Sequence, residues 1–182
     1  MAAGRRAAWW FAWLVVVRAA SAPCELGAKR RVIIEYSPIR SGSTVVYSLL
    51  RALFSEQHLV RKTHRAAELD ARACVVSTVR MPLDSICSSI LRAAPARRAA
   101  AAAAATGPPD DAVLRDHVKQ FRENGGDGLL ALVRGDGGAA ARPPVLLLRY
   151  EEFVHEVDRV FDAFESFFGA PIARARLSLI HI

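Results

Sequence analysis

The segment that most constrains the fold is residues 32–54, in which a short apolar run, a turn of small residues and an amphipathic run follow one another. The β-branched run Val32–Tyr36 predicts a strand of parallel-sheet character, and the apolar stripe of Ser43–Phe54 predicts a helix. The turn between them reads Ser-Pro-Ile-Arg-Ser-Gly over residues 37–42. The unpaired N–H groups of a first helical turn and the positive end of the helix dipole attract anions. This order therefore predicts an anion site to which Arg40 adds a fixed charge.

The rest of the chain alternates between strand and helix patterns. Further strands are expected at residues 58–62, Cys74–Val79 and Val145–Arg149, and further helices at residues 83–91, 110–123 and 154–168. Such alternation predicts an α/β domain of three layers, in which a central parallel sheet is flanked by helices. Ligands of such sheets bind at the carboxyl ends of the strands, where Arg40, Arg80 and Arg149 are expected.

Composition narrows the class of protein. With 182 residues, of which 52% are hydrophobic, the chain can form one domain with a buried core. The formal net charge is +7, but part of it lies in the first 22 residues, which contain no acid, so the excess elsewhere is mild. This excess suits an anionic ligand. We find neither zinc-ligand spacing nor a basic stripe interleaved with aromatic residues, so we expect no metal and no nucleic-acid partner.

The N-terminal segment is organised like a targeting signal. Arg5 and Arg6 precede an apolar stretch at residues 7–17, and residues 20–22 (Ala-Ser-Ala) resemble a cleavage site. Residues 1–22 are therefore predicted to be a signal peptide, or an uncleaved signal anchor that would hold the protein at a membrane. Either reading places the chain in the secretory pathway, in the Golgi lumen or secreted. An amphipathic N-terminus without this role is the alternative.

The remaining divisions follow from changes in composition. Residues 23–31 are expected to be a linker, residues 32–176 the α/β domain, and residues 97–109 a low-complexity insert within it. Residues 177–182 match what a common library-preparation adapter encodes when it is read in frame. We therefore expect this tail not to be native sequence and the domain to be truncated near residue 176; an ordinary hydrophobic C-terminus is the alternative.

The chain has three cysteines, at positions 24, 74 and 87. Cys74 falls in an expected buried strand and Cys87 on an expected helix. Cysteine is a small hydrophobic residue that is often buried, so we expect buried side chains rather than a disulfide framework. Cys24 could pair with a cysteine outside this chain.

A second informative motif begins at the end of the strand Cys74–Val79. Arg80 follows the strand directly, and Ser88 lies eight residues later on the expected helix. The planar guanidinium group of arginine can donate two parallel hydrogen bonds to a phosphate, so Arg80 and Ser88 are candidates for a second anion site. Asp84 is better explained as an acid that complements the helix dipole.

Four segments together resemble the sulfotransferases that use 3′-phosphoadenosine 5′-phosphosulfate as donor. Residues 80–84 (Arg-Met-Pro-Leu-Asp) with Ser88 resemble their 3′-phosphate motif, and residues 38–44 resemble their 5′-phosphosulfate loop in the arginine-bearing form of the Golgi carbohydrate enzymes. Residues 147–153 are similar to the strand-to-helix segment that follows in this family. Residues 62–64 (Lys-Thr-His) are similar to the Lys-Thr-His of the cytosolic branch. The matches occur in family order.

The resemblance implies a P-loop-type fold and transfer of a sulfuryl group from the donor to an acceptor hydroxyl, on a glycan or another secretory-pathway substrate. It implies that the donor is bound by Arg40, Ser41, Gly42, Ser43, Thr44, Arg80 and Ser88. It further implies that Arg40 meets the bridging oxygen, that Lys62 meets the sulfuryl oxygens, and that His64 is the general base, with His58 and Glu56 as lesser candidates. Such transfer depends on positioning and charge stabilisation, and we expect no metal.

The chain departs from the family in three ways that leave other functions open. The spacing from Lys62-Thr63-His64 to Arg80 is shorter than in the cytosolic enzymes. Many relatives have a lysine where Arg40 stands, and arginine stabilises charge but does not donate a proton near neutral pH. The later Arg/Lys-Gly segment, which closes over the nucleotide, has no counterpart here, as expected of a truncated chain. A non-catalytic binding module is therefore an alternative. A P-loop kinase is another, although the G-x-x-x-x-G-K-[ST] loop and the magnesium carboxylate that it needs are missing.

Overall fold

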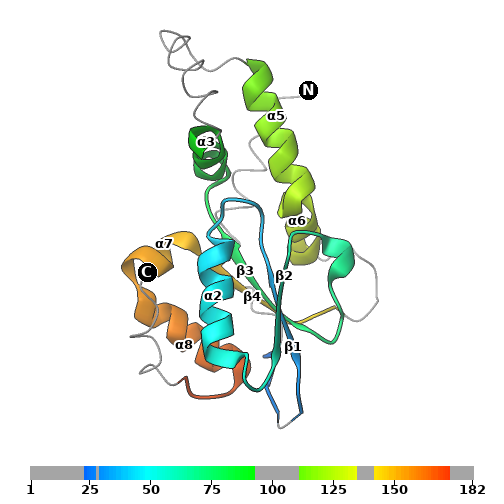
Figure 1. The fold of residues 1–182 in the computed structure, drawn as a ribbon, viewed down its shortest axis with the longest axis vertical. Coiled ribbons are helices and arrows are strands. Elements are labelled where there is room, and N and C mark those ends of the chain that lie inside the picture. The colour runs from blue at the N-terminus through cyan, green and yellow to red at the C-terminus, as the bar shows by residue number, and fades with distance from the viewer. Residues whose placement is uncertain (1–22, 28, 93–110, 135–141, 173–182) are drawn as a thin grey trace.

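The computed structural model describes residues 23–27, 29–92, 111–134 and 142–172, and the structural statements below concern these residues. One sheet of parallel strands forms the centre, in the order β2-β1-β3-β4 (Figure 1). Its strands are β1 (Val32–Tyr36), β2 (Leu59–Thr63), β3 (Cys74–Val79) and β4 (Val145–Arg149). Helices α2 (Ser43–Phe54) and α8 (Val157–Phe168) cover one face, and α6 (Asp127–Arg134) covers the other. The predicted three-layer α/β fold is confirmed.

The larger hydrophobic core lies between the sheet and helices α2 and α8. Ile33 and Val76 point into it from β1 and β3, and α2 contributes the stripe that its sequence predicted. The aromatic side chains in this core are Phe54, Phe161, Phe164, Phe167 and Phe168. The rings of Phe54 and Phe168 lie 4.7 Å apart between centroids. Burying one such side chain stabilises the fold by about 1.5–3 kcal/mol, so this layer fixes α8 against α2.

A second core lies on the opposite face of the sheet. Ile34 and Tyr36 of β1 and Val75 of β3 pack there against Leu129 of α6. Because successive side chains of a strand point to opposite faces, Ile33 and Ile34 enter different cores. This arrangement explains the uninterrupted apolar runs of the central strands.

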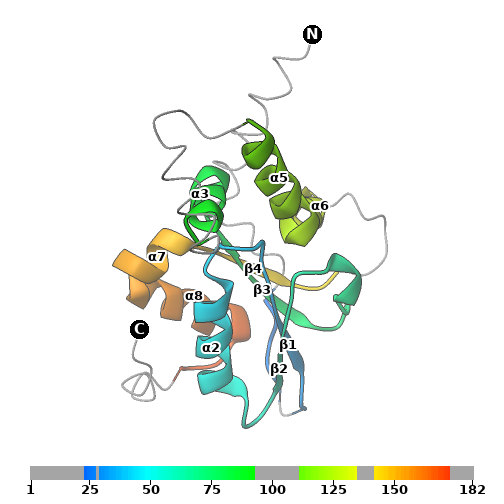
Figure 2. The same ribbon diagram turned by 45° about the horizontal axis from the view of Figure 1, so that its top comes forward.

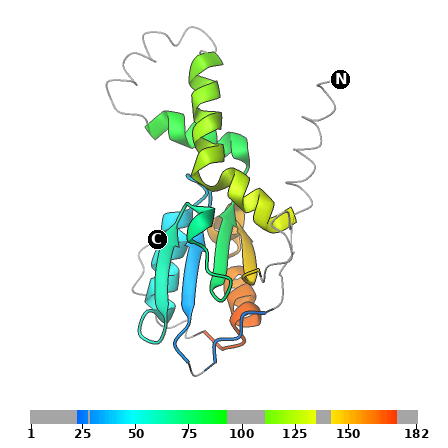
Figure 3. The same ribbon diagram turned by 90° about the vertical axis from the view of Figure 1, so that its right-hand side faces the viewer.

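The elements at the carboxyl end of the sheet form a separate layer. Helix α3 (Pro82–Arg92) follows β3, and helix α5 (Asp111–Phe121) rises beside it above the sheet (Figures 2 and 3). The segment η2 (Arg122–Gly126) joins α5 to α6 across a kink. A short 3₁₀ turn, η1 (Ala66–Glu68), follows β2.

Two predicted helices differ from the observed ones. The break expected at residues 124–126 is confirmed, because Asn124 and Gly125 have non-helical backbone angles, with a φ of 106° at Gly125; however, α5 already ends at Phe121, and the helix α6 that follows the break was not predicted. The helix expected at residues 154–168 is two helices, α7 (Tyr150–His155) and α8, separated at Glu156, whose φ is −140°. The strand expected at residues 58–62 is shifted by one residue, and α3 includes one residue more at each end than expected.

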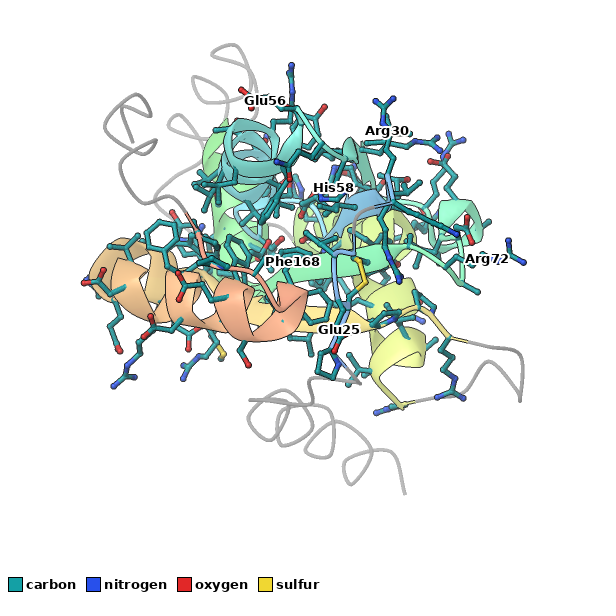
Figure 4. The ribbon with its side chains drawn as sticks, turned by 90° about the horizontal axis from the view of Figure 1, so that it is seen from below. Glu25, Arg30, Glu56, His58, Arg72 and Phe168 are labelled. Atoms are coloured by element: carbon teal, nitrogen blue, oxygen red, sulfur yellow. A yellow bond between two sulfur atoms is a disulfide. The ribbon has the colours of Figure 1, made fainter. Side chains whose placement is uncertain are left out.

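The cysteine prediction is wrong, because Cys24 and Cys74 form a disulfide (Figure 4). The N–H of Cys24 donates to the carbonyl of Phe167 at 2.8 Å, and the N–H of Leu26 donates to the carbonyl of Phe168 at 3.0 Å. These bonds bring the start of the predicted linker beside β3, with the two cysteine Cα atoms 5.6 Å apart, a separation that suits a disulfide. Cys87 is an exposed free thiol on α3.

Several predicted segments lie outside the described residues: the N-terminal targeting segment (1–22), the low-complexity insert (97–109) and the C-terminal tail (177–182). Within the described ranges, no helix has the length and hydropathy needed to cross a bilayer. The same ranges contain no cluster of three residues with metal-ligating side chains.

Removing the disulfide should destabilise the domain. We expect Cys24→Ser combined with Cys74→Ser to lower the free energy of unfolding by about 2–4 kcal/mol, because the unfolded chain is no longer cross-linked. Urea denaturation with and without dithiothreitol measures this loss. The reductant should shift the wild-type midpoint but not that of the double variant. Cys87→Ser is the control, and a wild-type midpoint indifferent to reductant would contradict the bond.

Candidate functional site

The candidate site is the loop of residues 37–42, which joins the carboxyl end of β1 to the first residue of α2. Two of its residues have left-handed backbone conformations: Arg40 with a φ of 62° and Gly42 with a φ of 96°. Gly42 is the N-cap of α2, and no side chain caps the helix there. The first turn also contains no acidic residue. The N–H of Val45 already donates to the carbonyl of Gly42 at 3.0 Å, so the N–H groups that an anion could meet at this helix start are those from Gly42 to Thr44. The anion site itself stays a prediction.

A buried hydrogen-bond network holds this loop to the neighbouring strand. The N–H of Thr78 donates to Oγ of Ser37 at 2.7 Å, and the hydroxyl of Thr78 donates to the same oxygen at 2.9 Å. Ser37 in turn donates to a carboxyl oxygen of Glu35. Ser41 donates to the carbonyl of Pro38 at 2.7 Å, inside the loop. The side chains of Glu35, Ser37, Ser41 and Thr78 are all buried. Ser41, which was predicted to bind the nucleotide, therefore stabilises the loop by an internal hydrogen bond.

The other side of the loop rests on the kink between α5 and α6. The N–H of Ile39 donates to the carbonyl of Asn124 at 3.2 Å. A Cβ atom on Gly125 would lie 3.1 Å from the carbonyl oxygen of Ser37 and from Cα of Pro38, so only glycine allows this approach without a shift. Sequence analysis missed this contact, although the Asn-Gly-Gly run marked a break in the helix.

Tyr36 stabilises the kink at Gly125 on which the loop rests. Its hydroxyl donates to the carbonyl of Gly125 at 3.2 Å. Burial raises the pKa of this phenol to about 12, with a further contribution from Asp127, so the group remains a donor at physiological pH. A Cβ atom on Gly128 would lie 2.1 Å from the hydroxyl oxygen, which explains the glycine at that position.

Lys62 and His64, two of the residues singled out by the resemblance, each contact the loop or the helix start that follows it. Nζ of Lys62 donates to Oγ1 of Thr44 at 3.0 Å, in the first turn of α2. Nδ1 of His64 lies 2.6 Å from the carbonyl oxygen of Ser37. A carbonyl only accepts hydrogen bonds, so Nδ1 carries the proton and neutral His64 has its free lone pair on Nε2. In this tautomer Nε2 is the ring nitrogen that can accept a proton.

His58 lies at the opposite edge of the sheet, just before the amino end of β2 (Figure 4). Its Nδ1 accepts the N–H of Arg31 at 3.3 Å, and burial together with Arg30 and Arg31 lowers its pKa. A pocket of about 240 Å³ at this edge is lined by Leu26, Gly27, Leu53, Phe54, Gln57, His58, Ala170, Pro171 and Ile172. None of the residues predicted to bind the nucleotide lines this pocket. We therefore place the candidate site at the carboxyl ends of the strands, where parallel sheets bind their ligands.

Arg80 is connected to the loop through the ring of Tyr150. The guanidinium carbon of Arg80 lies 4.5 Å from the centroid of that ring. A Cβ atom on Gly42 would lie 2.6 Å from Cδ2 of the same ring, so Tyr150 packs directly on the loop. Tyr150 was not predicted as a site residue, although it lies in the segment that resembles the family. Through this ring the predicted first and second anion sites are neighbours.

The remaining predicted residues are less directly placed. Ser88 is half-buried on α3. Ser85, one turn earlier, donates to the carbonyl of Arg40 at 3.4 Å and so ties α3 to the loop. Arg149 is largely exposed and pairs with Glu151 at 3.9 Å. Ser43 is buried in the first turn of α2, and Thr44 is exposed there.

Glu35 is the unexpected member of the site. It is fully buried at the end of β1, and its Oε2 has no hydrogen-bond partner among the described residues. Burial raises its pKa to about 8, although the bond from Ser37 and the charge of Lys62 act in the opposite direction. At neutral pH this carboxyl group is therefore mainly protonated. Sequence analysis missed Glu35, although an acidic residue inside the otherwise apolar run Val32–Tyr36 was a signal that could have identified it.

The left-handed backbone of Arg40 generates a stability prediction. Arg40→Gly relieves about 1 kcal/mol of strain, which offsets the entropy cost of glycine, about 0.5–1 kcal/mol. We expect an unfolding free energy within about 0.5 kcal/mol of wild type in urea denaturation. Arg65→Gly is the matched control, because Arg65 has an extended backbone with a φ of −110°, and it should lose about 1 kcal/mol. Equal losses in the two variants would contradict the strain.

The raised pKa of Glu35 generates a second prediction. Below pH 4.5 the carboxyl is neutral in both folded and unfolded chains; between 4.5 and about 8 it ionises only in the unfolded chain. Wild type should therefore lose stability relative to Glu35→Gln as the pH rises through this window, by up to about 1.4 kcal/mol per pH unit, and the difference should level off above it. Thermal unfolding at a series of pH values measures the difference. A constant difference would show that Glu35 titrates normally.

Comparisons with known proteins provide no assignment for this site. No protein-family model matches the chain, and no curated protein is significantly similar to it in sequence.

Proposed function

We propose that this protein is a sulfotransferase that moves the sulfuryl group of 3′-phosphoadenosine 5′-phosphosulfate to an acceptor hydroxyl. One observation carries the proposal: two cationic side chains, Lys62 and Arg80, flank a single helix N-terminus. Lys62 contacts the first turn of α2 directly, and Arg80 is connected to the loop through Tyr150. This arrangement suits a ligand with two separate anionic groups, such as a nucleotide with a 5′-phosphosulfate and a 3′-phosphate.

The loop and its charges would bind the 5′ end of the donor. The N–H groups from Gly42 to Thr44 would receive the phosphate oxygens, with hydroxyl groups of Ser43 and Thr44 at the same helix start. Arg40 would meet the bridging oxygen, where negative charge develops as the sulfuryl group leaves. Lys62 would leave Thr44 to contact the sulfuryl oxygens.

His64 would activate the acceptor. Its Nδ1 proton is directed at the carbonyl of Ser37, so Nε2 is free to take the proton of the acceptor hydroxyl. The S–O bond to the acceptor then forms as the bond to the nucleotide phosphate breaks, and the proton ends on His64. Arg80 and Ser88 would hold the 3′-phosphate at a distance from this reaction.

The kinase alternative fits the site less well. Phosphoryl transfer by P-loop enzymes uses a lysine within the loop and a carboxylate that holds magnesium after a strand. Here the cation comes from β2, and β3 is followed by Arg80. A non-catalytic module would bind the nucleotide but transfer no sulfuryl group, so a transfer assay distinguishes it from the enzyme.

The compartment and the acceptor are part of the same proposal. The disulfide between Cys24 and Cys74 supports the secretory pathway that residues 1–22 predict, because structural disulfides persist mainly in oxidising compartments. The arginine-bearing loop, similar to that of the Golgi carbohydrate enzymes, favours a glycan hydroxyl as acceptor.

Labelled donor and a panel of glycans test the proposal. We expect the wild-type protein to transfer the label without added metal. Arg80→Ala should bind adenosine 3′,5′-bisphosphate about 10–100-fold more weakly. His64→Ala should keep its nucleotide affinity and lose about 10²–10⁴-fold in kcat. Arg72→Ala is the control, since this exposed arginine lies before the amino end of β3 (Figure 4).

Each contrary result identifies a different error. Unchanged nucleotide affinity in Arg80→Ala would remove this residue from the site. Nucleotide binding without transfer to any acceptor would favour the non-catalytic module. Magnesium-dependent transfer from ATP would favour the kinase.

A further inference from the structure

The buried carboxyl of Glu35 and the ammonium group of Lys62 are neighbours beneath the candidate donor site. The two residues are register partners on adjacent parallel strands, so their side chains lie on the same face of the sheet, below the start of α2. Lys62 reaches past the sheet to Thr44 in the first turn of that helix. A buried acid next to the main cation of an anion site requires an explanation, because an ionised Glu35 would neutralise the charge that the ligand needs.

The surroundings of Glu35 favour its neutral form. Ser37 donates a hydrogen bond to one carboxyl oxygen of Glu35, and the hydroxyl oxygen of Ser37 in turn accepts hydrogen bonds from the N–H and the hydroxyl of Thr78. The charged or titratable groups that act on it are Lys62 on β2 and, through the carbonyl of Ser37, His64. From β3, Val76 and Thr78 bring no charge, and the first turn of α2 contains no acid. Desolvation is the dominant influence on the carboxyl group.

We propose that Glu35 is a positioning residue of the donor site, which holds a proton so that the charge of Lys62 stays available to the donor, and that donor binding and Glu35 protonation are therefore coupled. This inference rests on the proposed function. Glu35 does not touch the donor: it acts through Lys62, and through Ser37 on the loop. A bound polyanion disfavours a carboxylate beneath it, so binding raises the pKa of Glu35 above its value of about 8 in the free protein.

Coupling is reciprocal, so the sign of the pH effect follows. Above pH 8 the free protein loses the proton of Glu35, and the donor must restore it on binding. Nucleotide binding should then take up as much as one proton, and the dissociation constant should rise by up to about tenfold per pH unit between the two pKa values. At pH 6–7 Glu35 is already protonated, and the linkage disappears.

Binding of adenosine 3′,5′-bisphosphate from pH 6.5 to 9.5 tests the inference. Calorimetry gives the dissociation constant, and a pH indicator in weakly buffered solution reports the proton uptake. We expect wild-type affinity to fall above pH 8 with measurable uptake. Glu35→Gln, which mimics the neutral acid, should bind as tightly at pH 7 and lose both effects. Glu25→Gln is the matched control, because Glu25 lies at the opposite edge of the sheet, beside Gly169, and should behave like wild type (Figure 4).

The outcomes separate this inference from the function on which it rests. No binding of the nucleotide at any pH overturns both. Tight binding with neither proton uptake nor weakening above pH 8 in wild type overturns the role of Glu35 alone, and this measurement needs no variant that must fold. A merely structural glutamate would predict weaker binding of Glu35→Gln at every pH, and that result also overturns the inference.

Discussion

The site depends on the two hydrogen bonds that Thr78 donates to the hydroxyl of Ser37. They fasten the first residue after β1 to the adjacent strand β3, so the chain reverses at a fixed point before α2 begins. The same serine donates to Glu35, and its carbonyl contacts His64. One buried residue thus holds the loop and the buried acid through its side chain, and sets the tautomer of the candidate base through its backbone carbonyl. Buried polar groups of this kind are costly when unpaired, which makes the arrangement rigid.

The loop is held from both faces of the sheet. Beneath it, the network of Glu35, Ser37 and Thr78 closes the core on the α2 side. Beside it, the backbone of Gly125 at the kink between α5 and α6 approaches Ser37 and Pro38 closely. An anion-binding helix start gains strength when its N–H groups are already oriented before the ligand arrives, because ordering them then costs little on binding. The left-handed conformation of Arg40 is the strained element within this support.

Much of the fold was predictable because its signals are local. The apolar runs of β1, β3 and β4, the stripe of α2 and the glycine at its N-cap predicted the parallel sheet and the helix start. The break at Glu156 and the continuation after Gly125 were not predicted, since apolar periodicity persists across a kink. The disulfide was missed because 50 residues separate its cysteines, and only the pairing of residues 23–27 with the end of α8 brings them together.

The sequence by itself determined the strand, turn and helix that form the loop, because these depend on neighbouring residues. It also indicated Arg40, Lys62, His64 and Arg80 as candidates through their resemblance to a family. Only the tertiary structure decided how they relate. It placed Lys62 on Thr44, attached Arg80 to the loop through Tyr150, and left His58 at the far edge. Only the tertiary structure showed that the pKa of Glu35 is raised, since the protonation of a carboxyl group depends on burial by residues distant in sequence.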